Sequence, residues 1–324
     1  MEACPCGSRE LGASRIRLTH RGASYGLRPC RGCGRSLLDP SPSPEALLGC
    51  YDTAYYGVGA RKFVAPIEAG VEWFRRKRAE AVLAGAGRRG AAAGRPPRVL
   101  DLGCGSGAFL ARLAARGCEC HGTELTPVTA QRARAVPGLA LRTGPLTQDA
   151  YPDAHFDVIS LWHVLEHLPD PDAALRACRR WLAPGGVLLL AVPNLESWQA
   201  RLFRGAWFHL DPPFHLFHYG TRSLRGCLEA NGFRQTAIVH LCWQYNPYGF
   251  VQSFLNAAGF PRDEFYEWLK GNHPRTRPRL LAQAALALGL LPAATLATLL
   301  EAAFRRGGTI EVTALAAEGG PTPA

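Results

Sequence analysis

The feature that most constrains this chain is a glycine-rich turn that directly follows a short apolar segment. Val99–Leu102 has the composition of a buried strand, and the next residues carry three glycines at alternate positions: Gly103, Gly105 and Gly107. Glycine adopts backbone angles that other residues avoid, and without a Cβ it lets a ligand approach the main chain. A helical pattern over Ala108–Arg116 follows. This order predicts a parallel sheet that binds a ligand at the carboxyl ends of its strands.

Strand and helix patterns alternate from Arg98 onward, which is typical of a parallel sheet covered by helices on both faces. Strands are predicted over Arg98–Leu102, Glu119–Leu125, Phe156–Trp162, Val187–Val192, Thr236–Cys242 and Thr309–Leu315. Helices are predicted over Ala108–Arg116, Val128–Ala135, Asp172–Leu182 and Ser223–Asn231. Val187–Val192 is apolar throughout, so we expect it inside the sheet rather than at an edge.

Two carboxylates accompany the glycine turn. Glu124 ends the second predicted strand, where a carboxylate can accept hydrogen bonds from both hydroxyls of a ribose. Asp101 stands just before the turn, where it would repel a pyrophosphate and attract an ammonium or sulfonium group. The glycine spacing also differs from the G-x-G-x-x-G of dinucleotide sites. A purely structural turn in another α/β protein is the alternative interpretation.

Three segments together resemble the class I S-adenosylmethionine-dependent methyltransferases. They are VLDLGCGSG (Val99–Gly107), FDVISLWHVLEHLPDP (Phe156–Pro171) and LAPGGVLLLAVPN (Leu182–Asn194), and the resemblance covers about residues 98–240. It implies an α/β fold, with a Rossmann-like, mostly parallel seven-stranded sheet and helices on both faces. A small N-terminal zinc-ribbon-like module and a helical C-terminal insertion are expected in addition.

The resemblance also implies which residues contact S-adenosylmethionine. The expected cofactor-binding residues are Asp101, Gly103, Cys104, Gly105, Gly107, Glu124, Leu125, Leu146 and Leu161. The family usually places an Asp after the third strand, near the adenine amine. This chain has Gly144-Pro145-Leu146 there, so Gln148 or Asp149 is the candidate replacement.

Histidines near the ends of predicted strands are candidates for proton removal. Methyl transfer from a sulfonium is an in-line displacement, and an oxygen or nitrogen acceptor needs a base to take its proton. The catalytic candidates are His163, His167 and His215. His215 is favoured, because its run resembles the H-L-D-x-P-R-H-L segment of one methyltransferase subgroup, although Phe214 replaces the Arg. The alternatives are a hydrogen-bonded loop histidine at 215 and a supporting role for the Glu166-His167 pair.

Four cysteines near the N-terminus resemble the two knuckles of a zinc ribbon. The predicted metal ligands are Cys4, Cys6, Cys30 and Cys33, and four thiolates suit a structural, tetrahedral zinc ion. The first pair is one residue shorter than C-x-x-C, so His20 could replace one ligand, and a metal-free ribbon is the alternative. Eleven cysteines in 324 residues are too sparse for a disulfide scaffold, and Met1–Arg9 has no apolar run. Both observations predict a cytoplasmic protein.

The predicted organisation has three parts. Residues 1–50 form the zinc-ribbon-like module, 51–97 an aromatic and helical connector with a flexible linker, and 98–324 the methyltransferase domain. Insertions at 195–222 and 245–308 are expected to cover the substrate. Within the second insertion, Leu280–Leu300 is uncharged and Pro292 divides it. We predict two packed helices that form a lid or dimer contact, with a helical hairpin dipping into a membrane face as the alternative.

The function expected from these observations is methyl transfer from S-adenosylmethionine to a small-molecule, glycan or lipid-linked acceptor. The net charge of +11 lies mainly in residues 1–98, where 17 Lys and Arg against 8 Asp and Glu give +9. Only three basic residues are lysine, a bias that weakens charge as evidence for a nucleic-acid partner. An RNA methyltransferase and a non-catalytic cofactor-binding scaffold remain alternatives. Peripheral membrane contact and oligomerisation are left open.

Overall fold

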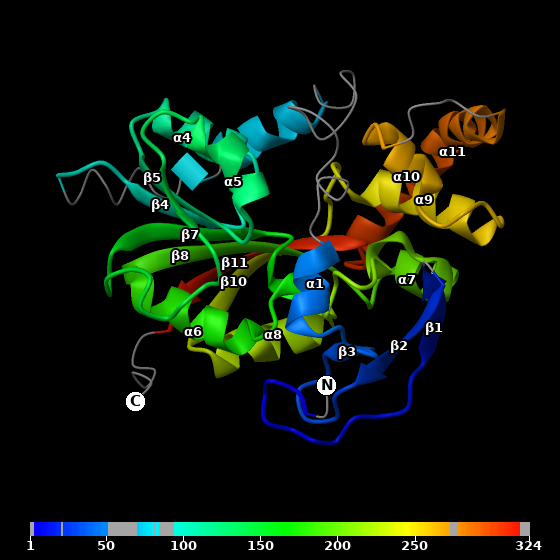
Figure 1. Cartoon of the computed structure of the whole chain (residues 1–324), viewed down its shortest axis with the longest axis horizontal. Coiled ribbons are helices and arrows are strands. Elements are labelled where there is room, and N and C mark those ends of the chain that lie inside the picture. Colours follow the sequence, from blue (N-terminus) through cyan, green and yellow to red (C-terminus); the bar gives the residue numbers. More distant parts are fainter. Residues whose placement is uncertain are drawn as a thin grey trace. The chain divides into compact units, whose positions relative to one another are not determined.

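The computed structural model describes residues 3–20, 22–50, 70–80, 82–83, 94–272 and 278–317. The chain divides into two compact units, each of which is described by itself (Figure 1). The sheet unit comprises Ala69–Ala191, Arg225–Ile238 and Val312–Ala324. The composite unit comprises Met1–Glu68, Val192–Leu224 and Val239–Glu311. The domain boundaries expected from the sequence stay a prediction, and the aromatic segment at 51–56 and most of the linker lie outside the described residues.

A seven-stranded sheet dominates the sheet unit, with the strand order β10-β11-β8-β7-β4-β5-β6. Its strands are β4 (Arg98–Leu102), β5 (Glu119–Glu124), β6 (Ala140–Thr143), β7 (Phe156–Trp162), β8 (Leu182–Pro193), β10 (Phe233–Val239) and β11 (Thr309–Ala316). The pairs β4–β5, β4–β7, β5–β6 and β7–β8 are parallel. The predicted α/β class with a mostly parallel sheet is therefore confirmed, and β8 lies inside the sheet as expected.

Helices join several pairs of strands that follow one another in the chain. They are α4 (Ala108–Ala114), α5 (Pro127–Arg134), α6 (Pro171–Trp181) and α8 (Thr221–Ala230). Figure 1 shows α4 and α5 on one face of the sheet and α6 on the other. Asp170 caps α6 by accepting a hydrogen bond from the backbone N–H of Ala173, and Pro171 opens the helix. Residues 70–80 and 82–83 are also helical.

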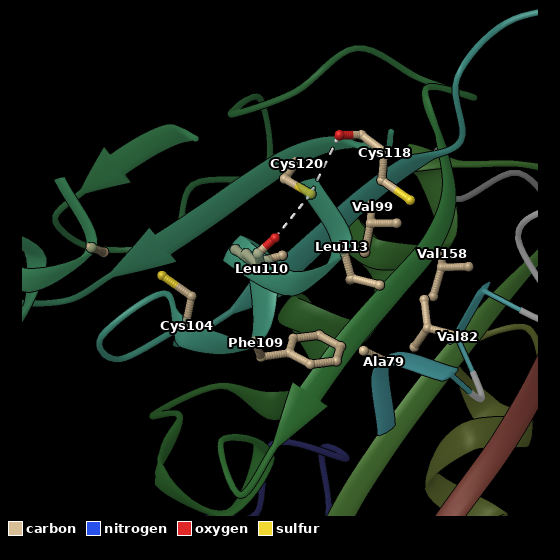
Figure 2. Packing of buried hydrophobic residues seen from close by; sticks show 11 residues of the cluster. Ala79, Val82, Val99, Cys104, Phe109, Leu110, Leu113, Cys118, Cys120 and Val158 are labelled. Atoms are coloured by element: carbon tan, nitrogen blue, oxygen red, sulfur yellow. Dashed lines mark hydrogen bonds between the residues drawn. The ribbon is translucent and has the colours of Figure 1, made fainter. Parts of the chain in front are cut away.

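The core beneath the glycine turn is shown in Figure 2. Phe109, Leu110 and Leu113 of α4 pack against Val99 and Val158 of the sheet. Burying a large aliphatic or aromatic side chain stabilises a fold by about 1.5–3 kcal/mol, so this contact holds the start of α4 against β4. The cysteines of the same core, Cys104, Cys118 and Cys120, are buried free thiols.

An antiparallel sheet forms the N-terminal part of the composite unit, in the order β1-β2-β3-β9. Its strands are β1 (Ile16–His20), β2 (Ala23–Pro29), β3 (Ser36–Asp39) and β9 (Phe217–His218). Its apolar residues form one core cluster with Trp207 and Leu210. Residues 16–39 therefore share a core with residues 200–210, which are far away in the sequence. The short helix α1 (Pro44–Cys50) follows β3.

The described residues of the composite unit also form the helices α7 (Trp198–Phe203), α9 (Asn246–Ala257), α10 (Glu264–Leu269) and α11 (Pro278–Ala303). The prediction of two helices over Leu280–Leu300 is wrong, because α11 is one continuous helix with Pro292 inside it. Proline in a helix interior costs about 3 kcal/mol. Here the flanking residues are mainly Leu and Ala, which have the highest helix propensities, and packing on α9 adds support. Among the described residues, α11 alone is long and apolar enough to cross a membrane.

Candidate active site

The glycine turn is built from three residues in the left-handed region, which favours glycine. Gly103, Gly105 and Gly107 have φ values of +66°, +58° and +70°. A Cβ at Gly103 would lie 2.7 Å from Val164 Cγ2, and a Cβ at Gly107 would lie 3.0 Å from Val136 Cγ2. Around Gly105 nothing lies within 4 Å of that position. The outer two glycines therefore serve close packing, while Gly105 presents bare backbone to open space.

The carboxylate of Glu124 faces this open backbone. Its Oε1 accepts a hydrogen bond of 2.5 Å from the Gly105 N–H, and its Oε2 accepts one of 3.1 Å from the Leu125 N–H. Glu124 is buried at the carboxyl end of β5, next to β4. Thr123 supports the same arrangement, because its Oγ1 accepts from the Gly103 N–H at 3.3 Å. The structure thus brings Glu124 and the glycine turn together as the sequence indicates, whereas Thr123 was not anticipated.

Asp101 lies in β4, two residues before Gly103 of the turn. It is buried, and its Oδ1 accepts a hydrogen bond of 2.6 Å from Ser160 Oγ on the adjacent strand β7. Burial raises the pKa of Asp101 to about 7; the Ser160 hydrogen bond lowers it, and the charge of Glu124 raises it further. The carboxyl group therefore changes its charge near neutral pH. Ser160 was not identified from the sequence; the only signal is a hydroxyl residue in an otherwise apolar strand.

His163 follows β7 and is held in an unusual backbone conformation. Its φ is +57°, although it is not glycine, and its N–H donates to the Ala191 carbonyl of β8 at 3.0 Å. Its Nδ1 lies 3.1 Å from Oε1 of Glu166, a carboxylate that is only 1% exposed. A strained backbone that the surroundings hold in place is frequent at functional sites. His167 stands in the same short turn, and its N–H donates to the Val164 carbonyl at 2.9 Å.

His215 lies in the composite unit and is described within it. It is buried, with Nδ1 2.9 Å from the His209 carbonyl and Nε2 3.8 Å from Asp211 Oδ2. These contacts correspond to the hydrogen-bonded loop histidine that the sequence left as the alternative, and its catalytic role stays a prediction. His218 nearby has its pKa lowered to about 3 by burial and by the charge of His215, so it is neutral.

The remaining cofactor candidates lie around the carboxyl ends of β4 to β7. Cys104 is buried in the glycine turn and donates its N–H to the Thr123 carbonyl at 3.0 Å. Leu161 is buried within β7, whereas Leu125 and Leu146 are half-buried after β5 and β6. Gln148 accepts a hydrogen bond from Trp181 Nε1 through its backbone carbonyl at 3.2 Å. Contact of these residues with a cofactor stays a prediction.

The four N-terminal cysteines lie close together in the structure. The thiol sulfurs of Cys4, Cys6, Cys30 and Cys33 all lie within 4.8 Å of one another. Cys4 and Cys33 are 3.6 Å apart, and Cys6 and Cys30 are 3.7 Å apart. A tetrahedral zinc site with Zn–S bonds of about 2.3 Å has S–S edges of about 3.8 Å, whereas a disulfide needs about 2.05 Å. The spacing therefore suits a metal and is too long for disulfides.

Arg35 completes the cysteine cluster and was not identified from the sequence. It is almost fully buried, and its Nε donates a hydrogen bond of 3.1 Å to Cys33 Sγ. Its guanidinium group also lies 5.9 Å from the ring centres of Phe217 and Tyr219. The hydrogen bond from Cys4 and the neighbouring Arg35 lower the pKa of the Cys33 thiol below its usual value. Thiolate is the form that binds metals.

The parallel sheet with its covering helices is a Rossmann-like fold. A glycine turn with a carboxylate facing it, at the carboxyl ends of the strands, is typical of folds of this class that bind adenosine-containing ligands. A family model described as a methyltransferase domain matches residues 74–238, half of the 324 residues, and the chain belongs to this family. The resemblance to class I S-adenosylmethionine-dependent methyltransferases is therefore confirmed.

Individual relatives match a smaller part of this chain than the family model does. The ubiquinone biosynthesis O-methyltransferase of Pseudomonas aeruginosa is 33% identical over 112 residues, covering 33% of this chain and 48% of the relative. Its namesake from Pasteurella multocida is 26% identical over 176 residues, covering 45% of this chain and 72% of the relative. The chain thus spans about half the length of the first relative. A solved structure of a candidate sarcosine dimethylglycine methyltransferase from Galdieria sulphuraria aligns with a TM-score of 0.49 and 15% identity, over 84% of this chain and 96% of that one.

Proposed function

We propose that this chain binds S-adenosylmethionine at the glycine turn and transfers its methyl group to an oxygen atom of a small-molecule acceptor. The observation that carries the proposal is the Glu124 carboxylate, which faces the open backbone of Gly105 at 2.5 Å. Family membership and two relatives named O-methyltransferases support it.

The residues of the turn fit the proposed cofactor. Open space over Gly105 gives room for the ligand, and Glu124 can accept hydrogen bonds from both ribose hydroxyls. The ionised form of Asp101 attracts the positively charged methionyl part. When bound, S-adenosylmethionine supplies a methyl group on a sulfonium, which is already activated for displacement. The protein's own task is therefore alignment and proton removal.

His163 is the base that the geometry of the sheet unit favours for this task. Nδ1 of His163 lies 3.1 Å from Oε1 of Glu166; in the tautomer that donates to this carboxylate, Nε2 is the ring nitrogen that accepts a proton. In the proposed reaction the acceptor oxygen forms a bond to the methyl carbon while the carbon–sulfur bond breaks. The hydroxyl proton of the acceptor goes to Nε2 of His163, so charge and atoms balance.

The acceptor class is inferred from the names of the relatives. Both named relatives function in ubiquinone biosynthesis according to their names, which favours a small molecule over a glycan, a lipid-linked intermediate or RNA. Calorimetry with S-adenosylmethionine tests cofactor binding. Mass spectrometry of cell extract incubated with the chain and a deuterated methyl donor then identifies the labelled product. Labelled RNA would replace the small-molecule assignment, and binding without any labelled product would leave a non-catalytic scaffold.

We also propose that the N-terminal cysteine cluster binds a structural zinc ion. Four thiol sulfurs within 4.8 Å, and the hydrogen bond that Arg35 Nε donates to Cys33 Sγ, support this assignment. Four protein ligands leave no open coordination position, so the ion would stabilise the composite unit rather than act on substrate. The eleven free cysteines suit a reducing compartment and support a cytoplasmic location.

A further inference from the structure

Helix α11 has the reverse of the usual amphipathic pattern. Its buried positions are mostly small or polar: Leu280, Gln283, Ala287, Ala294, Thr298 and Glu301. At 100° per residue these six positions fall within an arc of about 60°, so they form one face of the helix. This face packs on α9 and α10, where Ala287 and Ala294 contact Val251, Leu255 and Phe265. Three of these six buried positions, Gln283, Thr298 and Glu301, are polar, whereas a soluble helix usually makes its buried face apolar.

Outside this buried arc, the exposed surface of the helix carries a row of large apolar side chains. Its members are Leu281, Leu286, Leu288, Leu291, Leu296, Leu299, Leu300 and, just after the helix, Phe304. Leu288 is 72% exposed and Leu296 is 58% exposed. Single exposed leucines are ordinary in soluble proteins, but seven along one helix, followed at once by the exposed Phe304, are not. We call this row the leucine face.

The buried polar groups of α11 tie it to its own unit at both ends. Near the start of the helix, Gln283 Nε2 donates to Glu264 Oε2 of α10 at 2.8 Å. Near its end, Glu301 Oε1 accepts from the Gln199 N–H at 2.8 Å, and its Oε2 accepts from Gln199 Nε2 at 3.0 Å. Polar residues and alanines turned inward, with leucines turned outward, are the pattern of a helix that meets lipid.

We propose that the leucine face inserts into the headgroup region of an anionic lipid bilayer, with α11 lying parallel to the membrane surface. A spanning orientation does not fit. Both ends of α11 are hydrogen-bonded to elements of one unit, and β11 begins at Thr309, six residues after the helix, to join the sheet. A single crossing would separate these partners. A helix in the membrane plane keeps them together and buries its leucines.

Charge distinguishes a membrane from a second copy of the chain. The leucine face contains no charged residue, and basic residues flank it, with Arg279 at one end and Arg305 and Arg306 at the other. Glu264 pairs with Arg279 and Glu196 lies 3.7 Å from Arg306, while Arg305 is exposed. Two copies packed through this face, parallel or antiparallel, would bring arginine against arginine. Anionic headgroups would instead complement the arginines.

Flotation of the full chain with vesicles tests the proposal without any assay of methyl transfer. Vesicles of phosphatidylcholine with phosphatidylglycerol should carry the protein upward, and vesicles of phosphatidylcholine alone should carry at least tenfold less. Leu288→Glu should reduce flotation at least tenfold, and Leu296→Glu should do the same. Val128→Glu, on an exposed position of α5, adds the same charge and should float like the wild type.

Two results would overturn the proposal. One is failure of the wild-type chain to float with anionic vesicles while its circular dichroism shows a folded protein. The other is a lipid-free dimer, seen by analytical ultracentrifugation, that Leu288→Glu converts to a monomer. Because neither readout involves the cofactor, failure here would leave the proposed methyl transfer untouched.

Discussion

Nδ1 of His163 lies 3.1 Å from Oε1 of Glu166, and the two residues belong to the same turn after β7. Glu166 is 1% exposed, so its carboxylate is held in place by the fold rather than by solvent. A buried carboxylate that accepts from one ring nitrogen orients the imidazole and stabilises its protonated form. The turn therefore presents a histidine oriented by a buried carboxylate, at the carboxyl end of β7 and next to β4, which the glycine turn follows.

His163→Ala should lower turnover by about 10²–10⁴-fold, the usual contribution of a general base. The affinity for S-adenosylmethionine should stay within twofold, because His163 is assigned to the acceptor proton and not to the cofactor. Initial rates with the acceptor found in the extract experiment, together with calorimetry, measure the two effects separately. His155→Ala is the matched control and should keep most of the activity, because this half-buried histidine precedes β7 and lies outside the turn. Full turnover in His163→Ala would remove the assigned base.

The open space at Gly105 allows a test of cofactor binding that separates it from folding. Gly105→Ala should weaken S-adenosylmethionine binding at least tenfold, because the methyl group would fill the space where the ligand approaches. Gly117→Ala is the control: Gly117 also has a positive φ, of +83°, with nothing near its Cβ position, but it lies in the turn after α4. Both changes should cost about 1–2 kcal/mol of folding stability from the left-handed backbone.

Thermal unfolding and calorimetry on the two glycine variants give the comparison. Similar falls in melting temperature with a loss of binding only in Gly105→Ala would support the site. Equal cofactor affinities in the two variants would show that the ligand does not approach the chain at Gly105.

Local patterns in the sequence predicted the sheet and the glycine turn because the necessary information lies within a few residues. The alternation of apolar runs and helical periods gave β4, β5, β7 and β8 with small errors at their ends. The start of β8 was missed by five residues, since Pro184 and Gly185 read as a turn although the chain there continues as strand. Local chemistry also located Glu124 at the end of β5.

Contacts between distant residues could not be predicted in this way. Ser160 meets Asp101 because β4 and β7 pair in one particular register, which places these two residues opposite each other. Arg35 is buried because β3 pairs with β9, about 180 residues later in the chain. The continuity of α11 through Pro292 depends on packing against α9, which outweighs a local helix-breaking signal.

Cofactor affinity should depend on pH through Asp101. Burial raises the pKa of this carboxyl group to about 7, so it is mostly neutral at pH 6 and mostly ionised at pH 8. Only the ionised form attracts the positively charged methionyl part. Affinity should therefore fall as pH drops through 7, by about tenfold between pH 8 and pH 6. Calorimetry at both pH values, in buffers of equal ionic strength, measures the change.

Two controls identify Asp101 as the titrating group. 5′-Methylthioadenosine lacks both the sulfonium and the ammonium group, and its affinity should change less than twofold over the same range. Asp101→Asn should bind S-adenosylmethionine weakly and with no dependence on pH. An unchanged tenfold dependence in Asp101→Asn would assign the titration to another group.

If the cysteine cluster binds zinc, Cys33→Ser should lose the metal and Cys50→Ser should keep it. Purified wild-type chain should contain one zinc ion held by Cys4, Cys6, Cys30 and Cys33, whose sulfurs lie within 4.8 Å of one another. Cys33→Ser removes one of the four sulfur ligands, the one to which Arg35 donates, so elemental analysis should show the zinc content falling by more than half. Its melting temperature should fall too, because metal binding stabilises only the folded state.

Cys50→Ser is the matched control, since Cys50 is a free cysteine of the same unit at the end of α1, outside the cluster. It should keep both the zinc and the melting temperature of the wild type. His121→Ala tests a second group of possible ligands, Glu119, His121 and His155, and should also keep the zinc. Cobalt replacement adds a direct readout, because thiolate ligation gives an intense near-ultraviolet charge-transfer band that Cys33→Ser should weaken. Zinc-free wild-type protein that melts at the same temperature with and without added zinc would contradict the assignment, and Arg35 would then serve only to pair with a thiolate.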